Sequence, residues 1–225
     1  MPYQLSQAYW LYMGGSGIII SRKIKRDMEK FSNVNFDDIG TGDLMLDSGV
    51  GWLAKEIQDF TKCKYNHAAI FIRIDGILYV AEMNRRIKTL GAGLVETDFD
   101  EYFQGKDTVL ICKRKFTIDK DKAVNFITEN VGRIKYSYFN LIVAQPILQI
   151  TERIFGKGLW IGTNQANHMV CSAFASWFYM NMRPDMECWK DWAQKDPQDL
   201  YADNVNFFPL AWTRNGNAYH IPFIK

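Results

Sequence analysis

A β-hairpin signature between His67 and Met83 constrains the fold of this chain more than any other stretch. Two apolar runs, His67 to Ile74 and Ile77 to Met83, flank the dipeptide Asp75-Gly76. Asp-Gly supplies the two positive φ angles of a type I′ turn, which joins antiparallel strands through a two-residue loop. Both faces of this hairpin are apolar near the turn, and this pattern predicts a place in the centre of an antiparallel sheet.

The two-residue turn also predicts the strand register. If Ile74 faces Ile77, Ala69 lies opposite Glu82. His67 and Glu82 then share one face as diagonal neighbours, about 7–8 Å apart at the backbone and within side-chain reach. A buried glutamate needs a hydrogen-bond partner, and an imidazole is a suitable one. Two interpretations remain open: a pair that only satisfies two buried groups, and a pair that belongs to a functional site.

A cysteine stands directly before a helical pattern further along the chain. Phe174, Trp177 and Phe178 recur at i, i+3 and i+4 after Cys171, so we expect Cys171 in the first turn of a helix. The unpaired N–H groups and the dipole at a helix N-terminus favour a thiolate. A lone cysteine is more often a small buried hydrophobe, so Cys171 is a candidate nucleophile only if its side chain lies close to those of His67 and Glu82.

Those three side chains together would form a catalytic triad. His67 would take the proton from Cys171 and deliver it to the leaving group, and Glu82 would hold the tautomer of the imidazole. The backbone N–H of Cys171 would contribute to an oxyanion hole. His168 and Asn167, just before the cysteine, are further candidates for shaping that hole.

Composition narrows the function classes. The 225 residues are 48% hydrophobic, enough for one substantial core. The net charge of +2, from 27 basic and 25 acidic residues, gives no general attraction to nucleic acid. The four cysteines lie far apart and form no CxxC pair, which favours reduced thiols and a reducing compartment: Cys63, Cys112, Cys171 and Cys188.

The first 39 residues are predicted to form an N-terminal extension, and residues 40–225 the main domain. The apolar run Ala8 to Ile20 is interrupted by glycines, and it is shorter than the roughly 20 residues that a membrane helix needs. Its basic cluster, Arg22 to Arg26, follows the run instead of preceding it, so no signal peptide is predicted and a cytoplasmic location is expected. The extension is either a core segment with a basic helix or a docking arm for a partner or membrane.

The remaining pattern alternates strands and helices, as in an α+β domain. Strands are predicted at 42–46, 108–115, 205–212 and 218–223. Helices are predicted at 50–61, after a cap at Asp119, across 141–155 with a break at Pro146, and after the turn Asp196-Pro197.

The order of these motifs resembles the circularly permuted NlpC-type papain-like cysteine hydrolases, the YiiX/YaeF group, with lecithin:retinol acyltransferases as distant relatives. The resemblance covers roughly residues 40 to 201, and only the order and spacing of its short motifs make it specific. They are Gly42 to Leu46, Tyr65-Asn66-His67, Tyr79 to Glu82, Tyr136, Val170-Cys171-Ser172 and Asp196 to Leu200.

The resemblance implies a papain-like α+β fold, in which a central antiparallel sheet packs against the helix that carries the nucleophile. By position it implies Cys171 as nucleophile, His67 as base and Glu82 as the third polar residue. We expect no cofactor and no metal. Tyr65, Tyr136 and Asp43 are the expected substrate-binding residues. For the tyrosines the alternative is ordinary core packing, and for Asp43 it is a turn or cap at the start of a strand.

The expected function is a thiol-dependent peptidase or amidase that forms a covalent acyl-enzyme. A cell-wall peptide substrate would require delivery by a phage particle or by lysis. A lipid acyltransferase or thioesterase is the alternative enzyme. Two rival classes remain: a non-catalytic binding protein, and a zinc site made by Cys63, His67, His168 and Cys171. The substrate would be an amide or ester, peptide or lipid-like; no nucleic-acid partner is expected, and the oligomeric state is left open.

Overall fold

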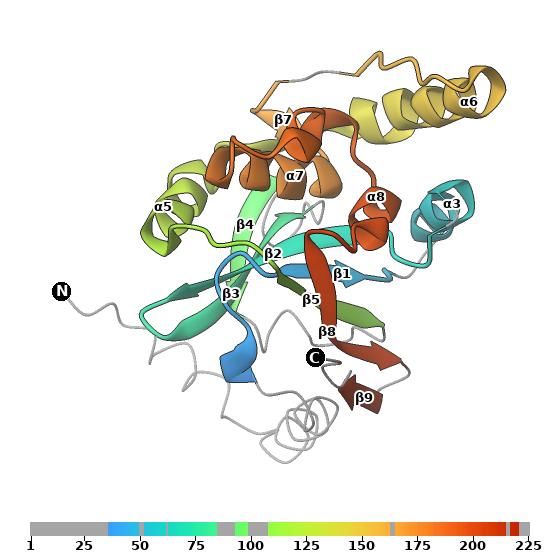
Figure 1. The fold of residues 1–225 in the computed structure, drawn as a ribbon. Helices are drawn as coiled ribbons and strands as arrows, with labels where there is room; N and C mark the ends of the chain where they lie inside the picture. The colour runs from blue at the N-terminus through green and yellow to red at the C-terminus, as the bar shows by residue number, and fades with distance from the viewer. Residues whose placement is uncertain are drawn as a thin grey trace, which may run out of the picture.

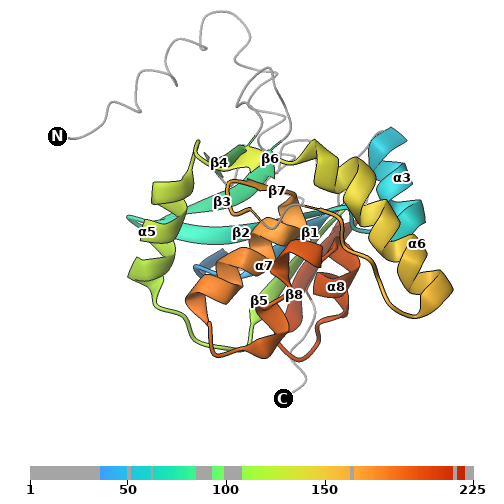
Figure 2. The same cartoon turned by 90° about the horizontal axis from the view of Figure 1, so that it is seen from above.

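The computed structural model describes residues 36–49, 52–61, 63–84, 93–98, 108–162, 165–214 and 217–220. Within these residues one sheet of nine strands carries its α-helices on one face (Figure 1). Seen from above, α7 lies over the middle of the sheet, with α5 to one side and α3 and α6 to the other (Figure 2). This arrangement confirms the predicted α+β class, with a central, largely antiparallel sheet against the helix that carries Cys171.

The strands follow the order β7-β6-β4-β3-β2-β1-β5-β8-β9 across the sheet. All neighbouring pairs are antiparallel except β6 and β7, which run parallel. Their bounds are β1 Leu44–Asp47, β2 His67–Ile74, β3 Ile77–Asn84, β4 Gly93–Asp98, β5 Val109–Arg114, β6 Lys135–Tyr136, β7 His168–Met169, β8 Phe207–Arg214 and β9 Asn217–His220.

The predicted hairpin is confirmed as the β2–β3 pair. Asp75 has φ 51° and Gly76 has φ 83°, the two positive angles that a type I′ turn requires. Ile74 faces Ile77 and Ala69 faces Glu82, as the two-residue turn predicts. The hairpin lies inside the sheet, between β1 and β4, so both of its edges are paired with neighbouring strands.

The helices also follow the sequence pattern closely. α5 begins after Asp119, whose side chain accepts a hydrogen bond from the Lys122 N–H, as a helix cap does. A π-helical turn precedes α6, and Pro146 lies in the first turn of α6, where its missing N–H costs nothing. The bounds are η1 Phe36–Asp38, α3 Trp52–Thr61, α5 Lys120–Asn130, η2 Asn140–Ala144, α6 Gln145–Phe155, α7 Cys171–Met182, η3 Glu187–Trp189, η4 Trp192–Gln194 and α8 Pro197–Ala202.

Two apolar clusters cover the two faces of the sheet. The larger joins α7, through Phe174 and Phe178, to the β2 residues Ile70 and Ile72. The smaller lies on the opposite face, where alternate residues of the same strands pack against Ile39. Residues 36–39, which the sequence assigned to the extension, thus pack against the domain. The prediction of a docking arm concerns residues that lie outside the described part of the chain.

Among the described residues, no helix has both the length and the apolar character to cross a bilayer.

Candidate active site

Tertiary packing brings Cys171 and His67 together from segments that are far apart in the sequence. Cys171 is the first residue of α7, and His67 is the first residue of β2, on which α7 packs. The side chains of the two residues form a hydrogen bond. The third predicted residue, Glu82 of β3, lies on the other side of the imidazole, with its Oε2 2.8 Å from His67 Nε2. Because Nε2 is engaged by Glu82, Nδ1 is the nitrogen available to the thiol.

The N-terminus of α7 leaves backbone donors beside the thiol. The first intrahelical bond runs from the Phe174 N–H to the Val170 carbonyl, so the N–H groups of residues 171–173 have no acceptor within the helix. The cap residue Val170 offers no side-chain acceptor. The Ser172 N–H and the Ala68 N–H of β2 both donate to the Cys171 sulfur. These donors favour negative charge on the sulfur and on an oxyanion formed next to it.

Electrostatics favours the ionised form of the cysteine–histidine pair. Burial opposes charge on both groups, but the attraction and hydrogen bond between them outweigh it. The pKa of Cys171 is therefore lowered from its ordinary value of 9.0, and the pKa of His67 is raised from 6.5. A thiolate beside an imidazolium is the reactive state of a cysteine nucleophile.

Asp47 is a residue of this site that the sequence analysis missed. It is the last residue of β1, fully buried, and directly opposite His67 in the β1–β2 pairing. Its negative charge raises the pKa of His67. A charged residue at the end of the apolar run Leu44 to Leu46 was the available signal, but only the register between β1 and β2 places it beside the imidazole.

Glu82 is held in place by a polar neighbour and by a strand. Asn84 donates from Nδ2 to Glu82 Oε1 at 3.2 Å, and β4 pairs with β3 so that Val95 lies opposite Glu82. The side chain of Glu82 is 10% exposed, against 18% for His67. The carboxylate thus has both oxygens engaged and little freedom to leave the imidazole, as an orienting residue requires.

A cavity of about 280 Å³ opens beside Cys171. It lies between the N-terminus of α7 and the helical segments α3, η2, α6 and α8. Its lining is mainly apolar, and Cys171 is part of it. The lining residues are Ile57, Thr61, Asn66, Leu141, Ile142, Gln145, Pro146, Gln149, Val170, Cys171, Ser172, Asp196 and Pro197.

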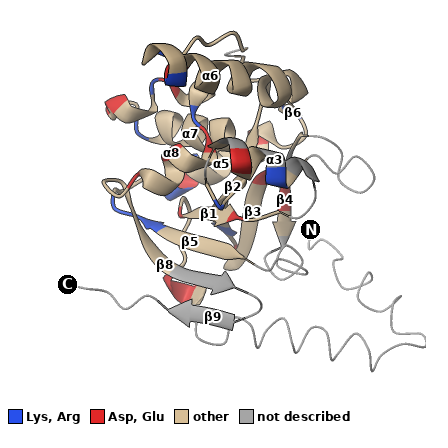
Figure 3. Cartoon of the chain, turned by 90° about the vertical axis from the view of Figure 1, so that its right-hand side faces the viewer, with Lys and Arg blue, Asp and Glu red and all other residues tan. Residues whose placement is uncertain are grey.

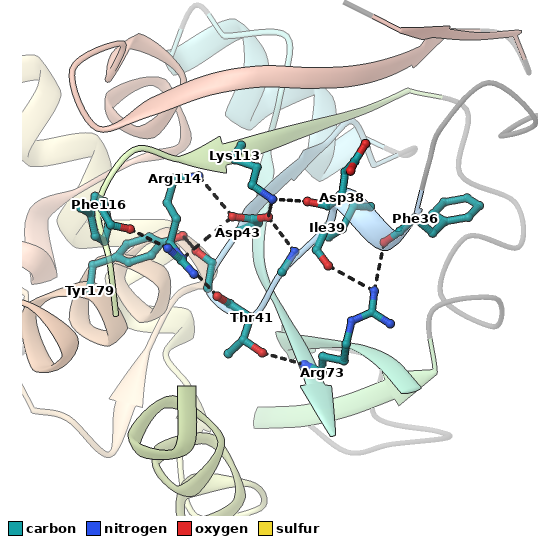
Figure 4. A network of polar contacts seen from close by, with 12 residues as sticks. Phe36, Asp38, Ile39, Thr41, Asp43, Arg73, Lys113, Arg114, Phe116 and Tyr179 are labelled. Atoms are coloured by element: carbon teal, nitrogen blue, oxygen red, sulfur yellow. Dashed lines mark hydrogen bonds and ion pairs between the residues drawn. The ribbon is translucent and has the colours of Figure 1, made fainter. Parts of the chain in front are cut away.

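Asp43, an expected substrate-binding residue, lies in a separate polar network (Figure 4). Its carboxylate is fully buried and accepts hydrogen bonds from the Gly40 N–H at 2.8 Å and the Arg114 N–H at 3.2 Å. Lys113 Nζ lies 3.4 Å from it. Burial raises its pKa despite these contacts. Asp43 does not line the cavity, and its contacts are those of a turn residue that ties β1 to β5.

The two tyrosines expected at the substrate are also absent from the cavity wall. Tyr65 is 1% exposed, belongs to the core beneath α7, and has its ring centroid 5.3 Å from that of Tyr201. Tyr136 is 8% exposed and pairs with Met169 across β6 and β7. The structure therefore places both tyrosines in the packing that supports the site.

The zinc alternative has no ligand set in the described part of the chain. No group of three or more His, Cys, Asp or Glu side chains there is arranged to hold a metal ion. Cys63 is buried in the apolar core, and His168 is exposed. Neither His168 nor Asn167 lines the cavity.

Comparison with known proteins supports the fold and nothing finer. No protein-family model matches the sequence, and no curated protein matches it either. A crystal structure described as metalloprotein YiiX from Escherichia coli O157:H7 is similar, with a TM-score of 0.53 and 12% sequence identity. The match covers 78% of this chain and 98% of that one. At this identity the likeness shows a shared YiiX-like, papain-like α+β fold alone.

Proposed function

We propose that this protein is a thiol-dependent hydrolase of the peptidase or amidase type, with Cys171, His67 and Glu82 as its triad. The observation that carries the proposal is the chain of contacts from Cys171 to His67 to Glu82 at the edge of a cavity. An ordinary buried cysteine has neither a charged base nor an adjoining cavity. The likeness to YiiX agrees with the fold that such a site would need.

In the proposed reaction, the Cys171 thiolate attacks the carbonyl carbon of an amide or ester. A carbon–sulfur bond forms, and the carbonyl oxygen becomes an oxyanion next to the N–H groups at the start of α7. As the oxyanion collapses, the bond to the leaving group breaks and His67 gives that group its proton. The product of this half-reaction is a thioester on Cys171.

The second half-reaction restores the enzyme. His67, now neutral, takes a proton from water, the hydroxide attacks the thioester, and the carbon–sulfur bond breaks to return the thiolate. An alcohol or amine in place of water would make the same site an acyltransferase. Glu82 accepts the hydrogen bond from His67 Nε2 throughout and keeps Nδ1 directed at the sulfur.

Labelling with a panel of activity-based electrophiles, followed by intact-mass measurement, tests this proposal. The wild type should gain one adduct, and Cys171→Ala should gain none. His67→Ala should slow the labelling, whereas Cys188→Ala, which removes an exposed thiol, should leave it unchanged. Labelling that is insensitive to Cys171→Ala would refute the triad.

A further inference from the structure

A row of polar residues crosses three neighbouring strands at the end of the sheet where His67 lies. β1, β2 and β3 are adjacent in the sheet, with α7 above them (Figure 3). Asp47 ends β1 and is directly opposite His67, the first residue of β2. Glu82 of β3 is opposite Ala69, two residues along from His67. Because cross-strand partners share a face with residues two apart, the imidazole has a carboxylate on the same face from each neighbouring strand.

Asp47 lies close to the imidazole and is shielded from solvent. Directly opposite residues of an antiparallel pair have Cβ atoms about 4.5–5.5 Å apart. Asp47 is 0% exposed, and the side chain of His67 is 18% exposed. The backbone carbonyl of Asp47 accepts from the Asn66 N–H at 3.0 Å, which fixes the end of β1 against the start of β2. Salt screens buried charges at this separation only weakly, so the carboxylate acts strongly on an imidazolium.

Among the described residues, the ionisable groups that act on His67 come from three elements: Cys171 of α7, Asp47 of β1 and Glu82 of β3. Burial lowers the pKa of His67, whereas the charge of Cys171, then the charge of Asp47, and then the hydrogen bonds with Cys171 and Glu82 raise it to about 10. On β5, the residue paired with Asp47 is the apolar Val109. Acylation removes the negative charge of Cys171. Asp47 is then the first of the remaining groups that favour the imidazolium.

The charge of the imidazole matters most in the second half-reaction, where His67 must be neutral to take a proton from water. After His67 has protonated the leaving group, the two carboxylates favour its reprotonation from solvent. That proton must return to solvent before His67 can activate the attacking water. Formation of the thioester needs no such step, because the resting thiolate–imidazolium pair already holds the proton that the leaving group receives.

We propose that Asp47 is a second positioning carboxylate for His67, which keeps the imidazole protonated in the acyl-enzyme and makes hydrolysis of the thioester slower than its formation. This inference rests on the proposed function and names the slow step of its reaction. Glu82 orients the ring through Nε2, whereas Asp47 holds its charge from β1. The thioester on Cys171 should therefore accumulate at neutral pH.

Pre-steady-state kinetics with p-nitrophenyl acetate test this order of steps. The wild type should release one equivalent of p-nitrophenolate in a fast phase, and the slower phase that follows should accelerate about tenfold per pH unit between pH 6 and 8. Asp47→Asn should speed the slow phase by up to about tenfold at pH 7, because the neutral fraction of His67 increases. Asp47→Glu keeps the charge and should keep the slow phase of the wild type.

Asp43→Asn is the matched control, at a fully buried carboxylate just before β1, and it should leave both phases unchanged. A slow phase that Asp47→Asn does not alter, or an equal loss in both phases, would overturn the role of Asp47. Absence of the fast phase together with absence of labelling at Cys171 would instead refute the proposed hydrolase.

An NMR titration of the histidine ring protons tests the same effect without catalysis. In Cys171→Ala, the pKa of His67 should lie above its ordinary value of 6.5, and addition of Asp47→Asn should lower the titration midpoint by about one pH unit or more. The exposed His168 provides the reference signal. Equal midpoints in the two proteins would overturn the proposal. A midpoint of His67 at or below 6.5 in Cys171→Ala would also overturn it, and that measurement needs no substitution at Asp47.

Discussion

Replacement of His67 by Gln should move the titration of Cys171 by more than any other single change. In the wild type, burial raises the pKa of the thiol, and the imidazolium of His67 more than reverses this effect. Gln keeps similar volume but carries no charge. Only burial and the two backbone donors then remain, so the pKa of Cys171 should return to about 9.0 or higher.

The size of the effect follows from the thiolate fraction. A thiol with a pKa of 9.0 is about 0.1% ionised at pH 6. Because His67 lowers the pKa of Cys171, the wild-type fraction is larger than this, and each tenfold gain in the acidity of the thiol that His67 provides is a tenfold loss of thiolate in the variant. A more basic thiolate is also more nucleophilic, with a Brønsted slope of about 0.4–0.5, so the net rate loss is about three- to fourfold for each such tenfold gain.

The assay is the rate of alkylation by iodoacetamide at each cysteine, measured by peptide mass between pH 5 and 10. The wild-type rate at Cys171 should level off well below pH 9. In His67→Gln it should keep rising about tenfold per pH unit toward pH 9. Cys188, which is exposed and whose pKa is raised by partial burial, is the internal control. If Cys171 and Cys188 titrate alike in the wild type, the proposed ion pair does not exist.

Three further changes separate catalytic from structural roles. Glu82→Gln should lower kcat by about 10²–10⁴-fold with little change in KM, because the imidazole loses the partner that fixes its tautomer. A thermal melt followed by circular dichroism checks that the variant is folded. Asp43→Ala should lower the free energy of unfolding by about 1–3 kcal/mol, because it leaves buried donors unpaired. It should not change the alkylation rate of Cys171 in the folded protein. A large change in that rate would show that Asp43 acts at the active site. Asp196→Ala should lower the free energy of unfolding by about 1 kcal/mol through loss of the α8 cap, whereas Asp196→Asn keeps an acceptor. The folded-state pKa of Asp196, about 6, lies above its ordinary value of 3.8, so the wild type should gain stability relative to Asp196→Asn as the pH falls from 7 to 4. Urea titrations of both proteins at pH 7 and pH 4 measure this difference. A loss of stability relative to Asp196→Asn would contradict the raised pKa.

The parts of the fold that were predictable are those that local chemistry determines. Asp75-Gly76 sets both the turn and the register, so the relation of His67 to Glu82 followed from short-range geometry. Asp119 and Cys171 mark the starts of their helices by a cap and by the periodicity that follows. These signals need no knowledge of distant segments.

The parts that were missed depend on packing between distant segments. β4 has no strong alternation, yet it pairs with β3 and encloses Glu82. Asp47 reaches His67 only through the β1–β2 register, which no turn residue encodes. The predicted Tyr65 and Tyr136 contribute to packing, since a large aromatic beside a site looks the same in sequence whether it faces core or cavity. The cavity itself lies between the N-terminus of α7 and four other helical segments, so no single stretch of the sequence predicts it.

The most direct test of the account is to detect an acyl group on Cys171 during turnover. The protein would be mixed with short p-nitrophenyl esters and peptide p-nitroanilides and quenched in acid within milliseconds to seconds. Its mass would then be measured by intact-protein mass spectrometry. The account predicts a transient adduct of the acyl mass that maps to Cys171, is released by hydroxylamine and is absent from Cys171→Ala. Equal consumption of these donors by the wild type and Cys171→Ala, with no adduct on either, would contradict it.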